Sequence, residues 1–156
     1  MSKVLVLLLV IMPWTVKSQE HDQISNRTIL KSYLIVNSTK NYSNALKLAQ
    51  SASNSLVIPF SLDGNVEHET FGLTSYQVSD SGQQLGYAPR GSGLKEDKVY
   101  VSIEHTQFIQ EFSEKEYIIV VATGRHEELL PYLDEVQKTY KDAYVKDLFL
   151  YSRAKN

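Results

Sequence analysis

Two segments of the chain align with each other without a gap: YLIVNSTKNYSNALKLAQSAS at residues 33–53 and YIIVVATGRHEELLPYLDEVQ at residues 117–137. Each opens on an apolar, β-branched run that is typical of a strand. Each then passes through a short polar turn into apolar residues at helical spacing. Asn41 or Ser43 can cap the first helix. The repeat therefore predicts a chain built on a duplicated strand-helix-strand unit.

A further strand is predicted after each helix, at residues 56–62 (LVIPFSL) and 143–151 (AYVKDLFLY). Pro59 has no N–H to donate to a strand ladder, so the strand at 56–62 should lie at the edge of the sheet. The apolar stripes that should face the sheet are Tyr42, Ala45, Leu46, Ala49 and Ala52 in the first helix and Leu129, Leu133, Val136 and Tyr140 in the second.

Between the two units lies a long insertion, residues 63–97, which is rich in Gly, Ser and Gln and contains one possible strand at 71–78. Residues 98–105 (KVYVSIEH) then alternate apolar and polar side chains, which predicts a half-buried strand. Its inward residues would be Val99, Val101 and Ile103, and its outward residues Tyr100, Ser102 and Glu104. Residues 106–112 could form a turn of helix that returns the chain to the second unit.

The first 18 residues have the order of a secretory signal: one early lysine, an apolar run at 4–12, and small residues up to Ser18. The apolar run is too short to cross a bilayer as a permanent anchor. We therefore expect cleavage near Ser18, a mature chain without a membrane span, and a periplasmic or secreted location. The mature chain should consist of a polar leader at 19–31, one domain at 32–151 that includes the insertion, and a tail at 152–156.

Charge and cysteine content exclude several classes of function. The chain has 16 basic and 18 acidic residues; without Lys3 and Lys17 of the signal, 14 basic residues remain against 18 acidic ones, a formal charge of −4. That balance argues against binding to nucleic acid or to an anionic membrane surface. No cysteine is present, so no disulfide can stabilise the fold.

The His126-Glu127 pair resembles the start of a zinc-protease motif but lacks its second ligand. Such a motif needs another histidine one helical turn later, whereas Leu130 occupies that position. Glu127 and Glu128 fit better as acidic residues in the first turn of a helix, where they complement its dipole. We therefore predict that His126 binds no transition metal. Pro131 should delay or kink this helix, because it lacks a backbone donor.

No other group of residues predicts catalysis. Ser92 between two glycines lacks the nucleophile-elbow pattern, and there is no cysteine to pair with a histidine. The acid-histidine groups at 67–69 and 104–105 lack the spacing of a metal site, and we interpret them as solvated polar residues. The sequence thus predicts a protein that is not an enzyme and has no cofactor or metal.

Two further features bear on binding. The strands YLIV and YIIVVA are apolar at every position, whereas a strand with one solvated face alternates. We expect residues 63–115, or else a partner, to cover the second face of the sheet. The chain also has ten tyrosines, whose rings suit either sheet packing or sugar stacking. Those on predicted strands are Tyr33, Tyr100, Tyr117, Tyr144 and Tyr151.

The two units resemble the repeats of the sporulation-related repeat (SPOR) family of bacterial cell-envelope proteins. The resemblance covers residues 32–62 and 116–151. It rests on the strand, small-residue turn and helix of both units and on KTYKDAYVK, which is similar to the family's helix-to-strand exit. It implies a βαββαβ, ferredoxin-like α+β fold in which two helices back an antiparallel sheet. It also implies noncatalytic binding of peptidoglycan glycan strands that lack stem peptides.

The family's strand motif carries a glutamine followed by a small polar residue. Here the glutamine positions fall on Val36 and Val120, so both glutamines are absent, and the small polar positions fall on Thr39 and Thr123. The glycan site that the resemblance implies, at the turn ends of the two equivalent strands, consists of Tyr33, Asn37, Thr39, Tyr117 and Thr123. Because two exposed valines would leave an apolar strip, we expect residues 70–78 or 108–112 to pack over Val36 and Val120.

A protein-interaction module is the alternative function. It could be an accessory factor of the envelope or an inhibitor of a secreted enzyme. Such a module would use the apolar sheet face or the insertion to bind its partner.

Overall fold

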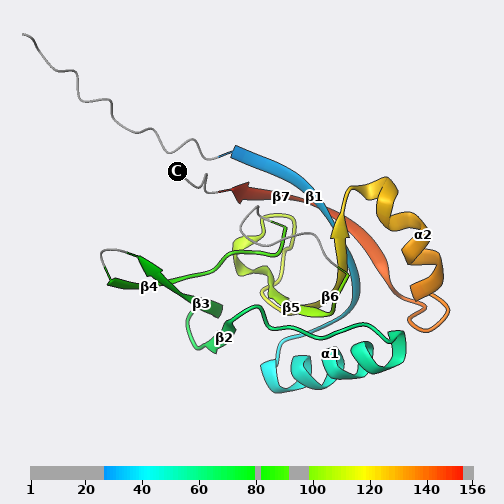
Figure 1. The fold of residues 1–156 in the computed structure, drawn as a ribbon, viewed down its shortest axis with the longest axis horizontal. Helices are drawn as coiled ribbons and strands as arrows, with labels where there is room; N and C mark the ends of the chain where they lie inside the picture. Colours follow the sequence, from blue (N-terminus) through cyan, green and yellow to red (C-terminus); the bar gives the residue numbers. More distant parts are fainter. Residues whose placement is uncertain (1–26, 80–81, 92–98, 153–156) are drawn as a thin grey trace, which may run out of the picture.

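The computed structural model describes residues 27–79, 82–91 and 99–152, so the predicted signal segment lies outside the described residues. Its main sheet has four antiparallel strands in the order β5-β6-β1-β7, backed by two helices (Figure 1). The elements are β1 (Arg27–Thr39), α1 (Tyr42–Leu56), β5 (Ser102–His105), β6 (Tyr117–Gly124), α2 (His126–Val136) and β7 (Tyr144–Ser152). This ferredoxin-like arrangement confirms the predicted α+β fold class. It also confirms that the equivalent strands of the two units, β1 and β6, lie side by side.

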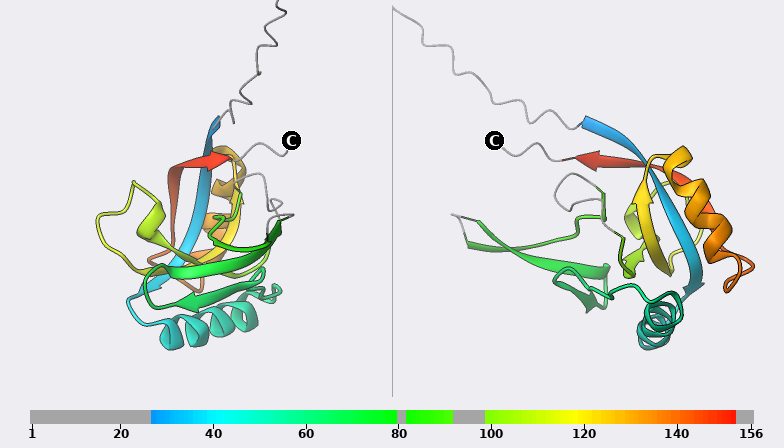
Figure 2. Two further views of the ribbon diagram at one scale, coloured as in Figure 1. Left: turned by 90° about the vertical axis from the view of Figure 1, so that its left-hand side faces the viewer. Right: turned by 45° about the vertical axis from the view of Figure 1, so that its right-hand side comes forward.

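β1 is longer than predicted. It begins at Arg27, inside the segment 19–31 that the sequence predicts to be a polar leader. Its first residues pair with the end of β7, with Leu30 opposite Phe149. The few apolar residues of segment 19–31 do not alternate with polar ones as in a half-buried strand, so the sequence did not predict a strand here. Pairing with β7 is what orders residues 27–31 as a strand. The two strands form an extension of the sheet beyond the end of β6 (Figure 2).

The insertion carries a second, three-stranded sheet in the order β2-β3-β4. Its strands are β2 (Asn65–His68), β3 (Gly72–Ser79) and β4 (Gly82–Gly86). β3 confirms the strand predicted at 71–78, whereas β2 and β4 are too short and polar to be predicted from the sequence. This sheet projects from the main sheet on the side away from α2 (Figure 1).

α1 forms where the pattern predicts it. The Asn41 side chain accepts a hydrogen bond of 2.9 Å from the Asn44 N–H and so caps the helix. The buried stripe is made of Ala45, Ala49 and Ala52, whose small side chains let the helix approach the sheet closely. The helix ends at Val57, which adopts a left-handed conformation with φ of 57°.

We expect Val57→Gly to raise the free energy of unfolding by about 1 kcal/mol, because a side chain with a Cβ is strained in the left-handed region. The Val57 side chain is 88% exposed, so its removal loses almost no packing. Urea denaturation measures the change. Val57→Ala is the matched control because it keeps the Cβ and therefore the strain. A glycine variant no more stable than the alanine variant would contradict this account.

The prediction of a strand at 56–62 is wrong. Leu56 still belongs to α1, and the segment after it makes only a single parallel bridge to the chain before β5. The carbonyl of Pro59 accepts from the Val101 N–H at 2.7 Å, and the Ser61 N–H donates to the Val101 carbonyl at 2.9 Å. Pro59 has no N–H with which to extend this ladder. β5 occupies the edge of the sheet instead.

α2 begins at His126 and carries in its first turn the two acidic residues that the sequence assigns there, Glu127 and Glu128. The Glu128 carboxylate accepts from the Arg125 backbone N–H at 3.1 Å and from the Arg125 Nε at 2.7 Å, which closes the start of the helix. Pro131 does not delay the helix, which runs through it. Leu129 and Val136 are the buried residues that hold α2 on the sheet.

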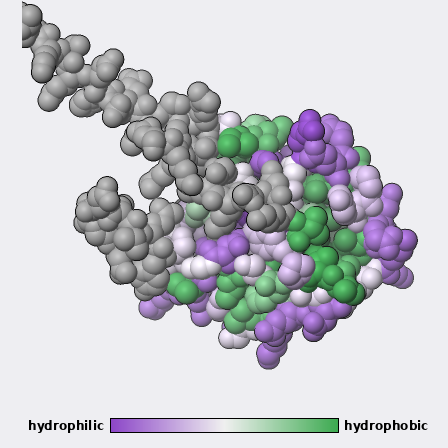
Figure 3. Space-filling view, in the orientation of Figure 1, coloured by the Kyte–Doolittle hydropathy of each residue, from purple (hydrophilic) through white to green (hydrophobic). Residues whose placement is uncertain are grey.

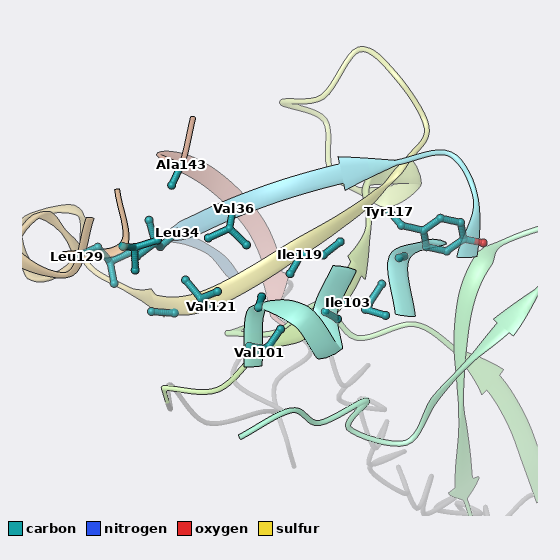
Figure 4. Packing of buried hydrophobic residues seen from close by; sticks show 14 of the residues in the cluster. Leu34, Val36, Val101, Ile103, Tyr117, Ile119, Val121, Leu129 and Ala143 are labelled. Atoms are coloured by element: carbon teal, nitrogen blue, oxygen red, sulfur yellow. The ribbon is translucent and has the colours of Figure 1, made fainter. Parts of the chain in front are cut away.

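The two faces of the main sheet carry separate hydrophobic clusters. Alternate residues of the central strands point toward the helices and pack with the α1 alanines and with Leu129 (Figure 4); they include Leu34, Val36, Ile119 and Val121. The intervening residues form the cluster on the other face, which contains Tyr33, Ile35, Ile109, Ile118, Val120, Leu148 and Leu150. Strands buried on both faces are apolar at every position, which explains the sequence pattern.

Val36 and Val120 therefore lie on opposite faces, and the expectation of one shared strip is wrong. In the ladder Ile35, and not Val36, is opposite Val120, and a bulge follows in β1. Both valines are nevertheless covered by the segments named above: Leu73 belongs to the cluster of Val36, and Ile109 and Phe112 belong to or pack on the cluster of Val120.

Part of the insertion also lies against the second face, as expected. Residues 87–91, which we call the strap, are held there by Arg90, whose side chain is fully buried. The Tyr33 hydroxyl donates to the Arg90 carbonyl. The Arg90 Nη1 donates to the carbonyls of Tyr100 at 2.7 Å and Val120 at 3.4 Å. The guanidinium carbon lies 3.6 Å from the centre of the Tyr100 ring. The strap thus contacts three segments of the sheet through a single residue, one by its carbonyl and two by its guanidinium.

The strap buries the polar side of β5, so the prediction that Ser102 and Glu104 face water is wrong. Tyr87 donates its hydroxyl to Glu104 Oε2 at 2.6 Å, and the Arg90 N–H donates to the same oxygen at 3.3 Å. Arg90 Nη1 also lies 3.2 Å from Ser102 Oγ. Burial, and then the charge of Glu104, raises the pKa of the Tyr87 hydroxyl well above its usual range, so it stays a neutral donor. Hydrogen bonds take the place of the water that the pattern implied.

Candidate functional site

The five residues predicted to bind glycan do not form one cluster. β1 and β6 run antiparallel, with Tyr33 opposite Thr123 and Thr39 opposite Tyr117. The turn ends of the two equivalent strands therefore lie at opposite ends of the ladder. The six-residue separation along β1 corresponds to roughly 20 Å.

Neither predicted tyrosine presents a ring face to a ligand. Tyr33 is fully buried, and its hydroxyl bonds to Arg90. Tyr117 is 7% exposed. Its ring packs against His105 with a centroid distance of 4.7 Å, and its hydroxyl donates to the Gly72 carbonyl at 3.3 Å. Both tyrosines pack in the core, which is the alternative to sugar stacking that the sequence allows for them.

The polar members of the set differ in accessibility. Thr123 is buried. Thr39 Oγ1 accepts from the Asn41 N–H at 3.3 Å and from the Asn44 side-chain amide at 3.2 Å, so it helps to organise the start of α1. Asn37 is exposed, with its Oδ1 accepting from the Ser38 N–H at 2.9 Å. Asn37 is thus the member of the set that a ligand can reach most readily.

Asn37 lies in a notch beside β1, next to the first residue of β7. β7 starts at Tyr144, opposite Ile35, so no described strand pairs with the rest of β1 on that side. The notch has a volume of about 240 Å³ and is lined by Val36, Asn37, Ser38, Asp142 and Tyr144. The loop before β7 is held by the Gln137 side chain, which donates to the Ala143 carbonyl at 2.8 Å. We call this hollow the β1 notch.

The β1 notch combines an aromatic ring with amide, hydroxyl and carboxylate groups. The Tyr144 side chain is 42% exposed. Partial burial, and then the charge of Glu116, raises the pKa of its hydroxyl, so it is a neutral hydrogen-bond donor at neutral pH. Asn37 can both donate and accept, and Asp142 can accept. A sugar can pack its C–H face on such a ring while its hydroxyls bond to the neighbouring polar groups.

Sequence reasoning did not assign Asp142 or Tyr144 to the site. Tyr144 belongs to a predicted strand, but its exposure depends on how far β7 reaches along β1, which is a tertiary property. The one sequence feature that could have pointed to Asp142 is its position directly before the predicted strand 143–151, because polar side chains at strand ends often line binding sites.

A second polar group lies at the start of α2 and β7. Asp147 Oδ1 accepts from Ser32 Oγ at 2.5 Å and lies 2.8 Å from His126 Nδ1. The Ser32 hydrogen bond, and then His126, lower the pKa of Asp147. In a catalytic triad the histidine stands between serine and carboxylate. Here the carboxylate stands between the other two, so the three side chains do not have the order of a catalytic triad.

Within residues 27–79, 82–91 and 99–152, no three acidic or histidine side chains are grouped to hold an ion. The neighbour of His126 is a single carboxylate, and that His126 binds no metal stays a prediction. Among the helices of this same part of the chain, none is long and apolar enough to cross a membrane.

The fold and site define a ferredoxin-like α+β domain with an inserted small sheet and an accessible aromatic and polar notch beside its central strand. Comparison of the chain with protein-family models, curated proteins and solved structures gives no significant match. The chemistry of the site is therefore the basis for assigning a function.

Proposed function

We propose that the protein is a noncatalytic binding module for peptidoglycan glycan strands in the cell envelope, and that the glycan binds in the β1 notch. The observation that carries the proposal is the exposed Tyr144 ring beside the Asn37 amide and the Asp142 carboxylate. The notch is smaller than the roughly 300–1,000 Å³ of pockets that enclose a whole small ligand. It suits one sugar unit of a chain that continues across the surface.

Two sequence features agree with this proposal. The N-terminal segment has the order of a secretory signal, which would bring the domain to the cell wall. Asn37, one of the residues that the SPOR resemblance implies for glycan binding, lines the notch. The other four do not line it, so the proposed site is a different surface from the one that the resemblance implies.

Co-sedimentation with purified sacculi, intact or stripped of stem peptides, tests the proposal. We expect Tyr144→Ala to lower the affinity for stripped sacculi about tenfold, through loss of the stacking surface and one hydroxyl. Asn37→Ala should lower it less. Tyr132→Ala is the matched control, because Tyr132 is a similarly exposed tyrosine, on α2. Wild-type protein that stays in the supernatant, or equal binding by all variants, would refute the notch as a glycan site.

A protein-interaction module is the second candidate function. It is favoured by two large apolar side chains, Leu30 and Phe149, which are paired across β1 and β7 and lie exposed on the surface.

A further inference from the structure

One edge of β1 is open. Residues 27–31 pair with β7 on one side, whereas β6 pairs with β1 only as far as Gly124, opposite Ser32. No strand of the described part of the chain pairs with residues 27–31 on the β6 side. Such an edge offers a row of backbone N–H and C=O groups to an incoming strand. We call it the open edge.

The outer edge of β7 is different, because it is guarded. The Phe149 N–H points away from the sheet, and Glu111 Oε1 accepts a hydrogen bond of 2.8 Å from it. Lys146 of β7 lies with its Nζ 4.8 Å from the centre of the Phe112 ring, which holds the same loop at that edge. A carboxylate placed on an outward N–H hinders pairing with another strand. Among the described strands, the β6-side edge of β1 carries no such guard.

Apolar side chains flank the open edge. Leu30 is 58% exposed and Phe149 is 57% exposed, and the two residues are directly opposite each other in the β1–β7 ladder. Side chains of directly opposed residues share one face of a sheet and lie next to each other. Figure 3 shows apolar surface over the start of β1. The fold gains little from this pair, whereas a ligand would gain by covering it.

A hollow with negative charge adjoins the pair. It is lined by Leu30, Ser32, Arg125, His126, Glu127 and Asp147. Arg125 is turned toward Glu128, which it contacts through Nε at 2.7 Å, so its charge is already compensated. Asp147 keeps its charge at neutral pH because its pKa is lowered by Ser32 and His126. Asp147 also contacts His126 at 2.8 Å, and the exposed Glu127 beside it adds a second carboxylate that favours a cationic side chain in the hollow.

We propose that the open edge binds an extended segment of a partner protein as an added β-strand that continues the line of β6. One apolar residue of that segment covers Leu30 and Phe149. A Lys or Arg two positions away on the same face reaches Glu127 and Asp147. The spacing follows from the sheet, because Leu30 and Ser32 are also two residues apart and residues i and i+2 share a face. Main-chain hydrogen bonds supply affinity, and the two side chains supply selectivity.

This interaction does not depend on glycan binding, because the β1 notch and the open edge lie at opposite ends of β1. A second copy of the chain fits the open edge poorly. Antiparallel self-pairing of residues 27–31 would set Lys31 of one copy opposite Arg27 of the other, and like charges directly opposite each other destabilise a sheet.

Selection from a phage-displayed library of random heptapeptides tests the proposal with the full chain. We expect enrichment of peptides with an apolar residue and a Lys or Arg two positions apart. Leu30→Thr, which keeps a good strand former but removes apolar area, should weaken their binding about tenfold. Glu127→Gln should weaken it about threefold and reduce its dependence on salt. Val57→Thr changes an exposed apolar residue just after α1 and should bind like the wild type.

Amide hydrogen exchange locates the bound peptide. Slower exchange at residues 28–31, with no change at 36–39, is the expected result. Three outcomes would overturn the proposal: no enrichment of the apolar-and-basic pattern, equal affinity of the enriched peptides for Leu30→Thr and wild type, or protection at 36–39 in place of 28–31. Sacculus binding can succeed or fail in either case, so the two proposals are tested separately.

Discussion

Replacing Arg90 with methionine is expected to lower the free energy of unfolding by about 3–5 kcal/mol, as is usual when one member of a buried charged network is removed. The Arg90 side chain is fully buried and joins the strap to β5 and β6. Without it, the carbonyl of Tyr100 and the hydroxyl of Ser102 lose their donor in a place that water does not reach. The carboxylate of Glu104 would also remain buried without that positive charge nearby.

Urea denaturation measures the loss, and Arg125→Met is the matched control because Arg125 is an exposed arginine whose salt bridge faces solvent. A double variant with Glu104→Gln should be more stable than the sum of the single effects predicts, by about 1 kcal/mol or more, because the two charges compensate each other. If Arg90→Met cost no more than Arg125→Met, the strap would not depend on its buried cation.

Replacing Gly72 with alanine is expected to destabilise the fold by about 2–5 kcal/mol. Gly72 has φ of +72°, which alone costs a residue with a Cβ about 1–2 kcal/mol. An added Cβ would also fall within 2.5 Å of three atoms of the His105 ring, which is itself packed against Tyr117. Relief of such a contact in a packed region adds about 1–3 kcal/mol.

Gly64→Ala separates these two contributions. Gly64 has nearly the same backbone angle, φ of +74°, but nothing lies within 4 Å of the added Cβ. We therefore expect only the backbone cost of about 1–2 kcal/mol for this variant. Thermal or urea unfolding of both variants gives the comparison. Equal losses would show that the His105 ring yields freely, and that β3 and β5 are not held together at this contact.

The candidate site was only partly predictable from the sequence. Asn37 lines the β1 notch as an exposed polar residue. Tyr33 has a side chain suited to stacking on a sugar, but it is buried and bonded to Arg90, which lies 57 residues further along the chain. Tyr144 belongs to the notch because β7 begins opposite Ile35, a register that the strand sequences do not reveal. Exposure of an aromatic ring depends on distant segments, so composition alone could not rank these tyrosines.

The sequence by itself determined the two strand-helix units and the cap of the first helix. The spacing of Ala45, Ala49 and Ala52 sets the buried stripe of α1, and Asn41 marks its first turn. Glu127 and Glu128 mark the start of α2 as acidic residues of its first turn. These features act between residues at most a few positions apart, through hydrogen bonds, dipole interactions and helical periodicity, and can therefore be recognised before the chain is folded.

Only the tertiary structure decided which strand fills the edge of the sheet and which polar residues face water. The segment 56–62 is rich in strand formers, but Pro59 limits its pairing and β5 takes the edge. Glu104 alternates with apolar neighbours as a solvated residue would, yet the strap buries it. An alternating pattern shows that the two faces of a strand have different surroundings. Whether the polar surroundings are water or a buried hydrogen-bond network depends on a segment that arrives only when the chain folds.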